Sequence, residues 1–256
     1  MKLQSALGQY ELLHELGKDS DGKPFRVWRA KVRETGAPIV IKEAESKHEA
    51  WLLGHEYQIL CELSHQSICR AIDFFIDKAG ACLVLAYAGE YTLDALLPGN
   101  PRSMGQALAH VASGLAYAHD NGVVHRDIKP ENVVLNGLAT IVDWGASYHL
   151  GQDRGKLQEL PYGTFEYMGP EQLRRRKPDP QQDVFSFSVM AYEGLTGDRP
   201  FSRRGGKNIF EKPLYRAERV QSFGEFGELI ITGLSTNPDR RPTMNALAEA
   251  AVPFLN

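Results

Sequence analysis

A polar stretch near the middle of the chain, "HRDIKPEN" at residues 125–132, contains side chains that could do chemistry. It combines an imidazole, a guanidinium, two carboxylates, an ammonium and a carboxamide within eight residues. The apolar runs "VV" and "VVL" flank it directly. Polar groups between apolar runs usually face a site, because an apolar core does not accept them without partners. We therefore expect this stretch to line a binding or catalytic site.

The composition limits what such a site can belong to. The chain has 256 residues, of which 43% are hydrophobic and 24% are charged, so it can bury one large core or the cores of two lobes. Its 29 basic and 32 acidic residues give a net charge of −3. No overall field therefore favours nucleic acid or an anionic membrane, and an anionic ligand must be held by local groups.

The cysteines and the N-terminus favour a cytoplasmic protein. Cys61, Cys69 and Cys82 form an odd set without the spacing of metal ligands. Nothing at the N-terminus resembles a secretory signal, and no apolar run approaches the roughly 18 to 20 residues of a spanning helix. We expect no membrane span and no nucleic-acid partner, and the sequence does not indicate an oligomeric state.

Two regions with different patterns must position the site. The first region reads as strands with one helix at 48–65, whose apolar face would include Trp51, Leu52 and Leu53. The expected strands are 9–17, 26–32, 38–44 and 81–89. After about residue 92 the pattern becomes helical. The expected helices are 92–97, 103–122, 183–197 and 226–234. A cleft between two such lobes is a natural place for a ligand.

Three motifs occur in a fixed order. "HRDIKPEN" is followed by "DWG", which begins eleven residues after Asn132, and then by "GTFEYMGPE" at 163–171. They resemble the catalytic loop, the metal-binding loop and the substrate-binding segment of the eukaryotic-type (Hanks-type) Ser/Thr protein kinase family. "IVIK" at 39–42 resembles the lysine motif of the same family. The resemblance covers essentially the whole chain.

The resemblance implies an α+β, bilobal protein kinase fold in a single domain. The small β-rich N-lobe with one helix would span about 1–87, and the larger, mainly α-helical C-lobe about 92–256. The small residues of "AYAGEYT" would form a hinge at about 86–91.

The resemblance also implies roles for individual residues and the cofactors ATP and Mg²⁺. Phosphoryl transfer depends on positioning and on neutralising charge on the phosphates. Asp127 would orient the acceptor hydroxyl and take its proton, and Lys129 would reach the γ-phosphate. Lys42 would hold the α- and β-phosphates. Asn132 and Asp143 carry hard oxygen donors that suit Mg²⁺.

Lys42 needs an anion to hold it, and the helix at 48–65 offers two. Family spacing favours Glu56, because Leu60, Leu63 and His65 follow it in the family's register. Glu49 is better explained as part of a solvated helix face.

The nucleotide pocket implied by the resemblance combines a glycine-rich lid with apolar walls. Its residues are Gly17, Gly22, Val27, Val40, Lys42, Leu85, Ala86, Ala88 and Val134. The family's lid normally has three closely spaced glycines, whereas this chain has only Gly17 and Gly22. Val40 stands where the family has a small alanine and would crowd the adenine.

Other residues take structural or minor roles in this interpretation. His125 is a packed core histidine, Asp183 anchors the catalytic loop, and Glu171 pairs with Arg241. The basic run "RRRK" at 174–177 reads as a solvated face, with docking of an acidic substrate as the lesser alternative.

Three functions remain open from the sequence. The first is an active kinase that phosphorylates Ser or Thr of protein substrates, with Lys129 and Thr164 favouring these acceptors over Tyr. The second is a pseudokinase scaffold with weak nucleotide binding, suggested by the irregular lid and Val40. The third is a kinase-fold enzyme that modifies a small molecule.

Overall fold

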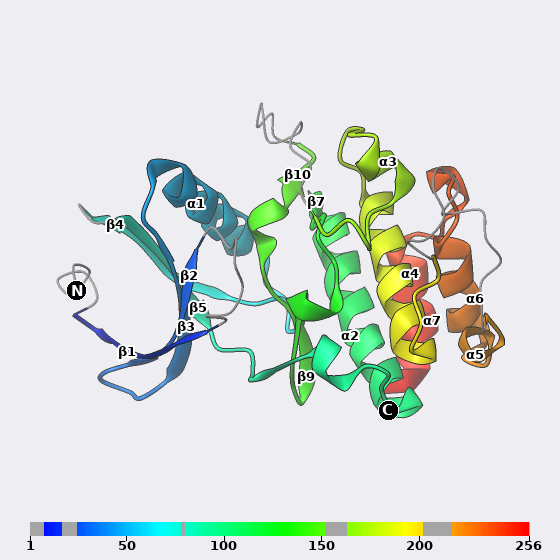
Figure 1. Cartoon of the computed structure of the whole chain (residues 1–256), viewed down its shortest axis with the longest axis horizontal. Coiled ribbons are helices and arrows are strands. Elements are labelled where there is room, and N and C mark those ends of the chain that lie inside the picture. Colours follow the sequence, from blue (N-terminus) through cyan, green and yellow to red (C-terminus); the bar gives the residue numbers. More distant parts are fainter. Residues whose placement is uncertain (1–7, 17–24, 78–79, 152–162, 202–216, 256) are drawn as a thin grey trace. The chain divides into compact units, whose positions relative to one another are not determined.

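The computed structural model describes residues 8–16, 25–77, 80–151, 163–201 and 217–255 (Figure 1). The chain forms two compact units. The first unit comprises 1–64, 68–88 and 143–145, and the second comprises 65–67, 89–142 and 146–256. The short segment 143–145 thus belongs to the first unit although it is distant from it in sequence.

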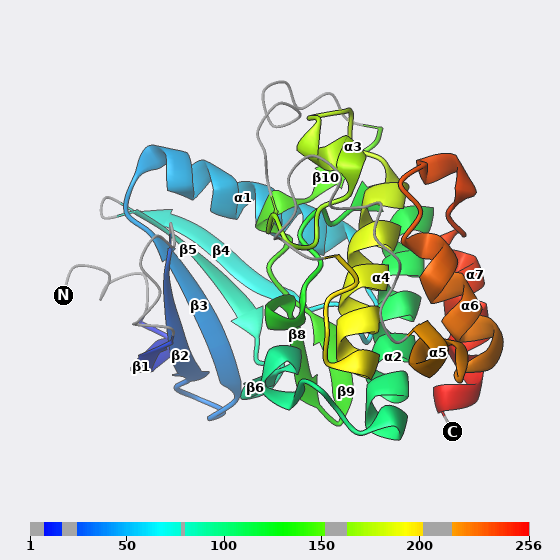
Figure 2. The same ribbon diagram turned by 45° about the vertical axis from the view of Figure 1, so that its right-hand side comes forward.

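The first unit is a five-stranded antiparallel sheet with the order β1-β2-β3-β5-β4 and one helix, α1, which packs against β3, β4 and β5 (Figure 2). Its elements are β1 (Tyr10–Leu16), β2 (Arg26–Val32), β3 (Pro38–Ala44), α1 (Lys47–Glu62), β4 (Ala71–Asp77) and β5 (Gly80–Ala86). The sequence did not lead us to expect β4. Its apolar residues Ile72 and Ile76 are exposed, so the strand lacks a clean apolar face.

Strand alternation separates two faces of β3. Ile39 and Ile41 pack into a buried cluster with Cys82 and Val84 of β5. Since side chains alternate along a strand, Lys42 projects from the opposite face. The Lys42 side chain therefore points away from the apolar cluster and toward polar partners.

Helix α1 begins at a complete capping box. The Ser46 hydroxyl accepts a hydrogen bond from the Glu49 N–H at 3.2 Å, and the Glu49 carboxylate accepts one from the Ser46 N–H at 2.9 Å. These backbone hydrogen bonds lower the pKa of Glu49. Glu49 is thus a capping residue on the exposed first turn of α1, a role that the sequence interpretation did not include. Trp51 is half exposed, so the expected apolar face of α1 does not include it.

The second unit is built around α4, which is buried along almost its whole length and contacts α2, α5 and α6 (Figure 1). A helix buried on nearly all sides belongs to a core. The α-helices are α2 (Pro101–Asp120), α3 (Pro170–Leu173), α4 (Pro180–Thr196), α5 (Ala217–Gln221), α6 (Gly224–Gly233) and α7 (Met244–Ala251). The 3₁₀ turns are η1 (Leu93–Leu96), η2 (Pro130–Asn132), η6 (Pro238–Arg240) and η7 (Val252–Leu255), and η3 (Trp144–Ala146) begins in the first unit.

Short strands complete the second unit. They form the sheet β6-β8-β9 and the pair β10-β7. Their bounds are β6 (Tyr91–Thr92), β7 (Val123–Val124), β8 (Val133–Asn136), β9 (Leu138–Ile141) and β10 (Tyr148–His149). Strand β7 ends just before residues 125–132 and pairs with β10. Strand β8 begins just after them and pairs with β6. Strand pairing therefore holds this polar stretch at both ends.

Gly89, the first residue of the second unit's segment 89–142, is required by a close approach. Its φ is +146°, and a Cβ there would lie 2.6 Å from the carbonyl oxygen of Leu135. A larger residue would therefore collide with the backbone of β8.

No described helix is both long and apolar enough to span a membrane.

Candidate active site

Lys42 forms a buried ion pair with Glu56 of α1. Its Nζ lies 2.8 Å from Oε1 and 2.9 Å from Oε2 of Glu56. The same ammonium donates to Oδ1 of Asp143 at 2.7 Å. Glu56 has no exposed surface, so a lone charge there would be strongly disfavoured. The expected partner of Lys42 is therefore in contact with it, and Asp143 joins the pair.

The protonation of these groups follows from their contacts. Burial would lower the pKa of Lys42, but the charges of Asp143 and Glu56 outweigh burial and raise it. Burial raises the pKa of Glu56 against the opposing effect of Lys42. Lys42 therefore stays charged at neutral pH and presents a fixed cation.

The residues around Asp143 fix its position. The Trp144 N–H donates to Oε1 of Glu56 at 3.2 Å, and the Trp144 side chain is fully buried. Asp143 has a left-handed backbone with φ +62°, which non-glycine residues rarely adopt. Such strain persists only where the surroundings impose it, and it is concentrated at functional sites.

In the second unit, Asp127 is surrounded by donors. Its Oδ1 accepts hydrogen bonds from the N–H of Thr164 at 2.7 Å and from the Thr164 hydroxyl at 2.9 Å. Its Oδ2 lies 3.1 Å from both the amide nitrogen of Asn132 and the ammonium of Lys129. Lys129 also donates to the Thr164 hydroxyl at 2.6 Å. Asp127, Lys129, Asn132 and Thr164 thus form one hydrogen-bonded group.

Asp183 of α4 fixes the backbone that carries this group. Its Oδ2 accepts from the His125 N–H and its Oδ1 from the Arg126 N–H, each at 2.7 Å. His119 lies 2.8 Å from Oδ2. Burial would raise the pKa of Asp183, but these hydrogen bonds and the nearby imidazoles lower it. Arg126 has φ +73°, so the two backbone hydrogen bonds hold a strained turn. His125 is fully buried.

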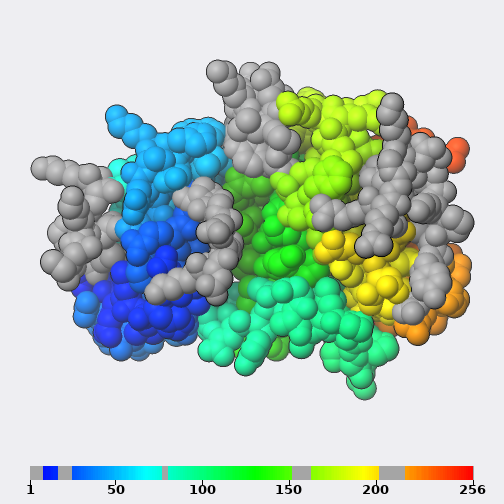
Figure 3. All heavy atoms as spheres, in the orientation of Figure 1, coloured from blue at the N-terminus to red at the C-terminus, as the bar shows by residue number. Residues whose placement is uncertain are grey.

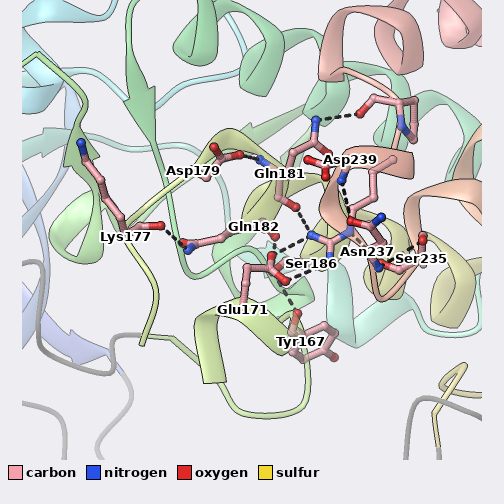
Figure 4. Close-up of polar contacts among 12 residues, drawn as sticks. Tyr167, Glu171, Lys177, Asp179, Gln181, Gln182, Ser186, Ser235, Asn237 and Asp239 are labelled. Carbon is pink, nitrogen blue, oxygen red and sulfur yellow. Dashed lines mark hydrogen bonds and ion pairs between the residues drawn. The ribbon is translucent and has the colours of Figure 1, made fainter. Parts of the chain in front are cut away.

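A bidentate ion pair between Glu171 and Arg241 joins the segment 163–171 to the helical core. The Arg241 guanidinium donates to Oε1 of Glu171 at 2.7 Å and to Oε2 at 2.9 Å, and the Arg241 side chain is fully buried. Figure 4 shows Glu171 within the surrounding polar contacts, which include Gln181 and Ser235. Arg241 reaches the main-chain oxygens of both residues.

The apolar residues expected around a nucleotide lie on defined strands. In the first unit's sheet, Val27 is paired with Lys42, and Val40 is paired with Leu85. The Ala86 N–H donates to the carbonyl of Arg70 at 2.9 Å, and Ala86 is paired with Ile39 at the end of β5. Ala88 is the last residue of the segment 68–88 of the first unit, and Val134 lies on β8 of the second unit. Gly17 and Gly22 lie outside the described residues.

Asp143 in the first unit and Asn132 in the second each carry an oxygen donor of the kind that a hard divalent cation prefers. The Asp143 side chain is half exposed, so its carboxylate is open to a ligand. The amide nitrogen of Asn132 is committed to Asp127, which leaves its oxygen as the donor atom. Mg²⁺ is commonly held by one or two protein oxygens together with phosphate oxygens. The described residues contain no cluster of three or more His, Cys, Asp or Glu that could hold a metal, so a site dominated by protein ligands is not evident there.

Several contributing residues were not identified from the sequence. Gln172 donates from its amide to the carbonyl of Arg126 at 2.7 Å, and His119 contacts Asp183. No local signal marks either residue, because each partner is distant in sequence. Ser46 was detectable, since Ser-x-x-Glu before an apolar run is the pattern of a capping box.

Comparison with known proteins gives a consistent result. The family model described as "Protein kinase domain" matches residues 10–252. Aurora kinase of Schizosaccharomyces pombe is 30% identical over 93% of this chain and 69% of its own length. Aurora kinase A-B of Xenopus laevis is 32% identical over 97% of this chain and 62% of its own length. Serine/threonine-protein kinase pkn2 of Myxococcus xanthus is 30% identical over 95% of this chain.

The chain spans about two thirds of the length of the Aurora relatives and 32% of the length of pkn2. The match to the family model nevertheless extends over nearly all of the chain. The order of the motifs, the two polar groups around Lys42 and Asp127, and these matches agree. The chain therefore belongs to the protein kinase domain family.

Proposed function

We propose that this chain is an active Ser/Thr protein kinase that transfers the γ-phosphoryl group of ATP to protein hydroxyls. The observation that carries the proposal is the hydrogen-bonded group of Asp127, Lys129 and Thr164. Asp127 has an acceptor oxygen for the hydroxyl proton, and Lys129 supplies a cation beside it. The relative named serine/threonine-protein kinase pkn2 supports the choice of acceptor.

The remaining roles follow from charge and chemistry. Lys42 would hold the α- and β-phosphates, and Glu56 would keep it in position. Asn132 and Asp143 would hold Mg²⁺, which neutralises phosphate charge when bound. Val27, Val40, Leu85, Ala86, Ala88 and Val134 would contact the adenine. Protein substrates follow from the segment 163–171, which in protein kinases contacts peptides. The free cysteines Cys61, Cys69 and Cys82 support a reducing, cytoplasmic setting.

The two aspartates provide the test. Asp127→Asn should reduce phosphate transfer by about 100-fold or more while Mg²⁺-ATP affinity changes little, because the carboxylate would accept the hydroxyl proton and the Asp127 main-chain carbonyl would still hold the Asn132 amide. Asp143→Asn should weaken Mg²⁺-ATP binding as well, since it removes a metal ligand. Calorimetry measures binding, and transfer of labelled phosphate to a generic protein acceptor measures activity.

Asp239→Asn is a matched control, because it makes the same change at an exposed carboxylate. It should leave both measurements unchanged. Binding of Mg²⁺-ATP without any transfer by the wild-type chain would identify a pseudokinase. Transfer by Asp127→Asn at the wild-type rate would show that the assignment of the base is wrong.

A further inference from the structure

Four consecutive cations, Arg174, Arg175, Arg176 and Lys177, connect α3 to α4. We refer to them as the basic segment. All four residues are exposed, in a chain whose net charge is −3. No ion pair joins any of them to a carboxylate of the described residues. The charge is therefore local and available to a partner.

The backbone of the basic segment carries a second signal. The Arg176 N–H donates to the carbonyl of Glu171 at 3.0 Å, and the Arg175 N–H donates to that of Gln172 at 2.9 Å. This pair of bonds forms a Schellman motif, in which the residue at the position of Arg175 adopts a left-handed conformation and is usually Gly. Arg175 has φ +54° and bears the steric cost that Gly would avoid.

The three described non-glycine residues with positive φ are Arg126, Asp143 and Arg175. The first two belong to the candidate active site. Strained residues are concentrated at functional sites, so the third is also a candidate for a functional role.

The basic segment rests on a fixed platform. Glu171 and Gln172, just before it, are held by Arg241 and by the carbonyl of Arg126. After it, the Gln182 amide donates to the carbonyl of Lys177 at 3.3 Å. In Figure 4 the Lys177 ammonium points away from these contacts. Figure 3 shows the yellow-green segment that includes 163–177 on the surface of the second unit. The cations thus extend outward from an ordered backbone.

We propose that the basic segment binds an acidic stretch of the protein substrate. This rests on the proposed kinase function and adds a substrate class to it. Thr164 contacts Asp127, and Gln172, which precedes the basic segment by two residues, contacts the carbonyl of Arg126, so the stretch that leads into the basic segment is held against the catalytic loop. A substrate held at Asp127 would extend its flanking residues toward the basic segment.

Charge decides the class of partner. An acidic peptide is matched by a few adjacent cations, whereas nucleic acid requires a broad basic face, which a chain with 32 acidic and 29 basic residues does not indicate. Interaction with the dipole of α3 is a weaker explanation, because that helix has only four residues.

The test measures binding without catalysis. A fluorescein-labelled peptide with Ala at the acceptor position and six Glu nearby is compared with a peptide in which Gln replaces each Glu. We expect the Glu peptide to bind about tenfold more tightly at low salt, and this advantage should shrink as salt rises. A variant with Arg174→Gln, Arg175→Gly, Arg176→Gln and Lys177→Gln should lose it.

The single variant Arg175→Gly separates binding from folding. Gly is the preferred residue of a Schellman motif, so this variant should unfold at an equal or higher urea concentration while its affinity for the Glu peptide falls. Arg240→Gln, at an exposed cation elsewhere in the second unit, should retain full affinity.

Each result bears on one proposal. Equal binding of the Glu and Gln peptides, or unchanged affinity in the four-residue variant, would overturn the basic segment as an acidic-peptide site. Equally tight binding of a single-stranded oligonucleotide that competes with the Glu peptide would overturn the choice of a protein partner. Selective peptide binding without phosphate transfer to the matching Ser peptide would contradict the kinase function and leave the basic segment supported.

Discussion

A single ammonium, that of Lys42, shows how the site keeps a charge in a buried position. The three oxygens within 2.9 Å belong to two carboxylates, so the cost of burial is offset by ion pairs and hydrogen bonds. The raised pKa means that Lys42 loses its proton only at a pH above that of an unfolded lysine. Its charge is therefore constant over the physiological range, and any pH dependence of activity there must come from other groups.

Some of these residue contacts could be predicted and others could not. Glu56 followed from the family's register, whereas the cap formed by Glu49 was missed although its pattern is local. The contact of Lys42 with Asp143 joins residues 101 positions apart, and no periodicity reports it. Chemical type identifies candidate residues, but only the fold shows which of them touch.

At the residue scale, the substitution Val40→Ala should strengthen ATP binding. Val40 is half buried beside Leu85, in the place where the family has a small alanine. Removing its methyl groups should relieve crowding and tighten ATP binding by about 1 kcal/mol at most. Calorimetry measures the change. Val32→Ala makes the same substitution at a residue packed on the apolar cluster of β3, and it should lower stability without affecting ATP. Unchanged or weaker ATP binding by Val40→Ala would show that Val40 does not obstruct the nucleotide.

At the scale of elements, segments with a strong hydrophobic periodicity were predicted correctly, and segments with a weak one were not. The expected strands at 26–32 and 38–44 coincide with β2 and β3, and α2 and α4 begin two or three residues before their expected starts. Prolines at Pro101 and Pro180 mark these true starts, since proline suits the first helical turn. The short strands β6 to β10 and helices α3, α5 and α7 were missed. Strands of two to four residues are too short to show a period, so their pairing depends on the folded backbone.

The capping box of α1 yields a prediction for an element. Ser46→Ala removes the acceptor for the Glu49 N–H and leaves the rest of the helix unchanged. The free energy of unfolding should fall by about 1 kcal/mol, and urea denaturation followed by circular dichroism measures it. Ser103→Ala, at an exposed serine of α2, is the control and should cost less. Equal losses in both variants would mean that the cap does not contribute as described.

At the scale of the whole molecule, the order of motifs predicted the family, and this prediction is confirmed by the match over residues 10–252. The α+β class is confirmed as well, with a five-stranded sheet in the first unit and helices dominating the second. Fold class was predictable because motifs and patterns extend along the entire chain. The anchoring pairs, such as Arg241 with Glu171, were implied only by the resemblance, since they join residues 70 positions apart.

Asp183 links the folding of the second unit to pH. Its lowered pKa means that the folded state binds a proton at Asp183 less readily than the unfolded state, where the pKa of an aspartate is about 3.9. The stability it contributes is present above that pH and is lost as pH falls through the folded-state pKa. The groups that face its carboxylate are the imidazoles of His119 and His125 and the N–H groups of His125 and Arg126.

Asp183→Asn should therefore be most damaging at neutral pH. The new amide has one acceptor oxygen in place of two, so its NH₂ group would face a backbone N–H or His119 and leave a buried donor without an acceptor. The free energy of unfolding should therefore fall by about 3 kcal/mol at pH 7. The difference from wild type should shrink below about pH 4, where the unfolded wild-type chain begins to bind a proton at Asp183 more readily than the folded chain does. Urea denaturation at pH 7 and at pH 3.5 measures both values. Asp239→Asn, at an exposed carboxylate, should change neither by more than about 0.5 kcal/mol. A loss of stability in Asp183→Asn that is equally large at both pH values would mean that its shape, and not its charge, supports the turn at Arg126.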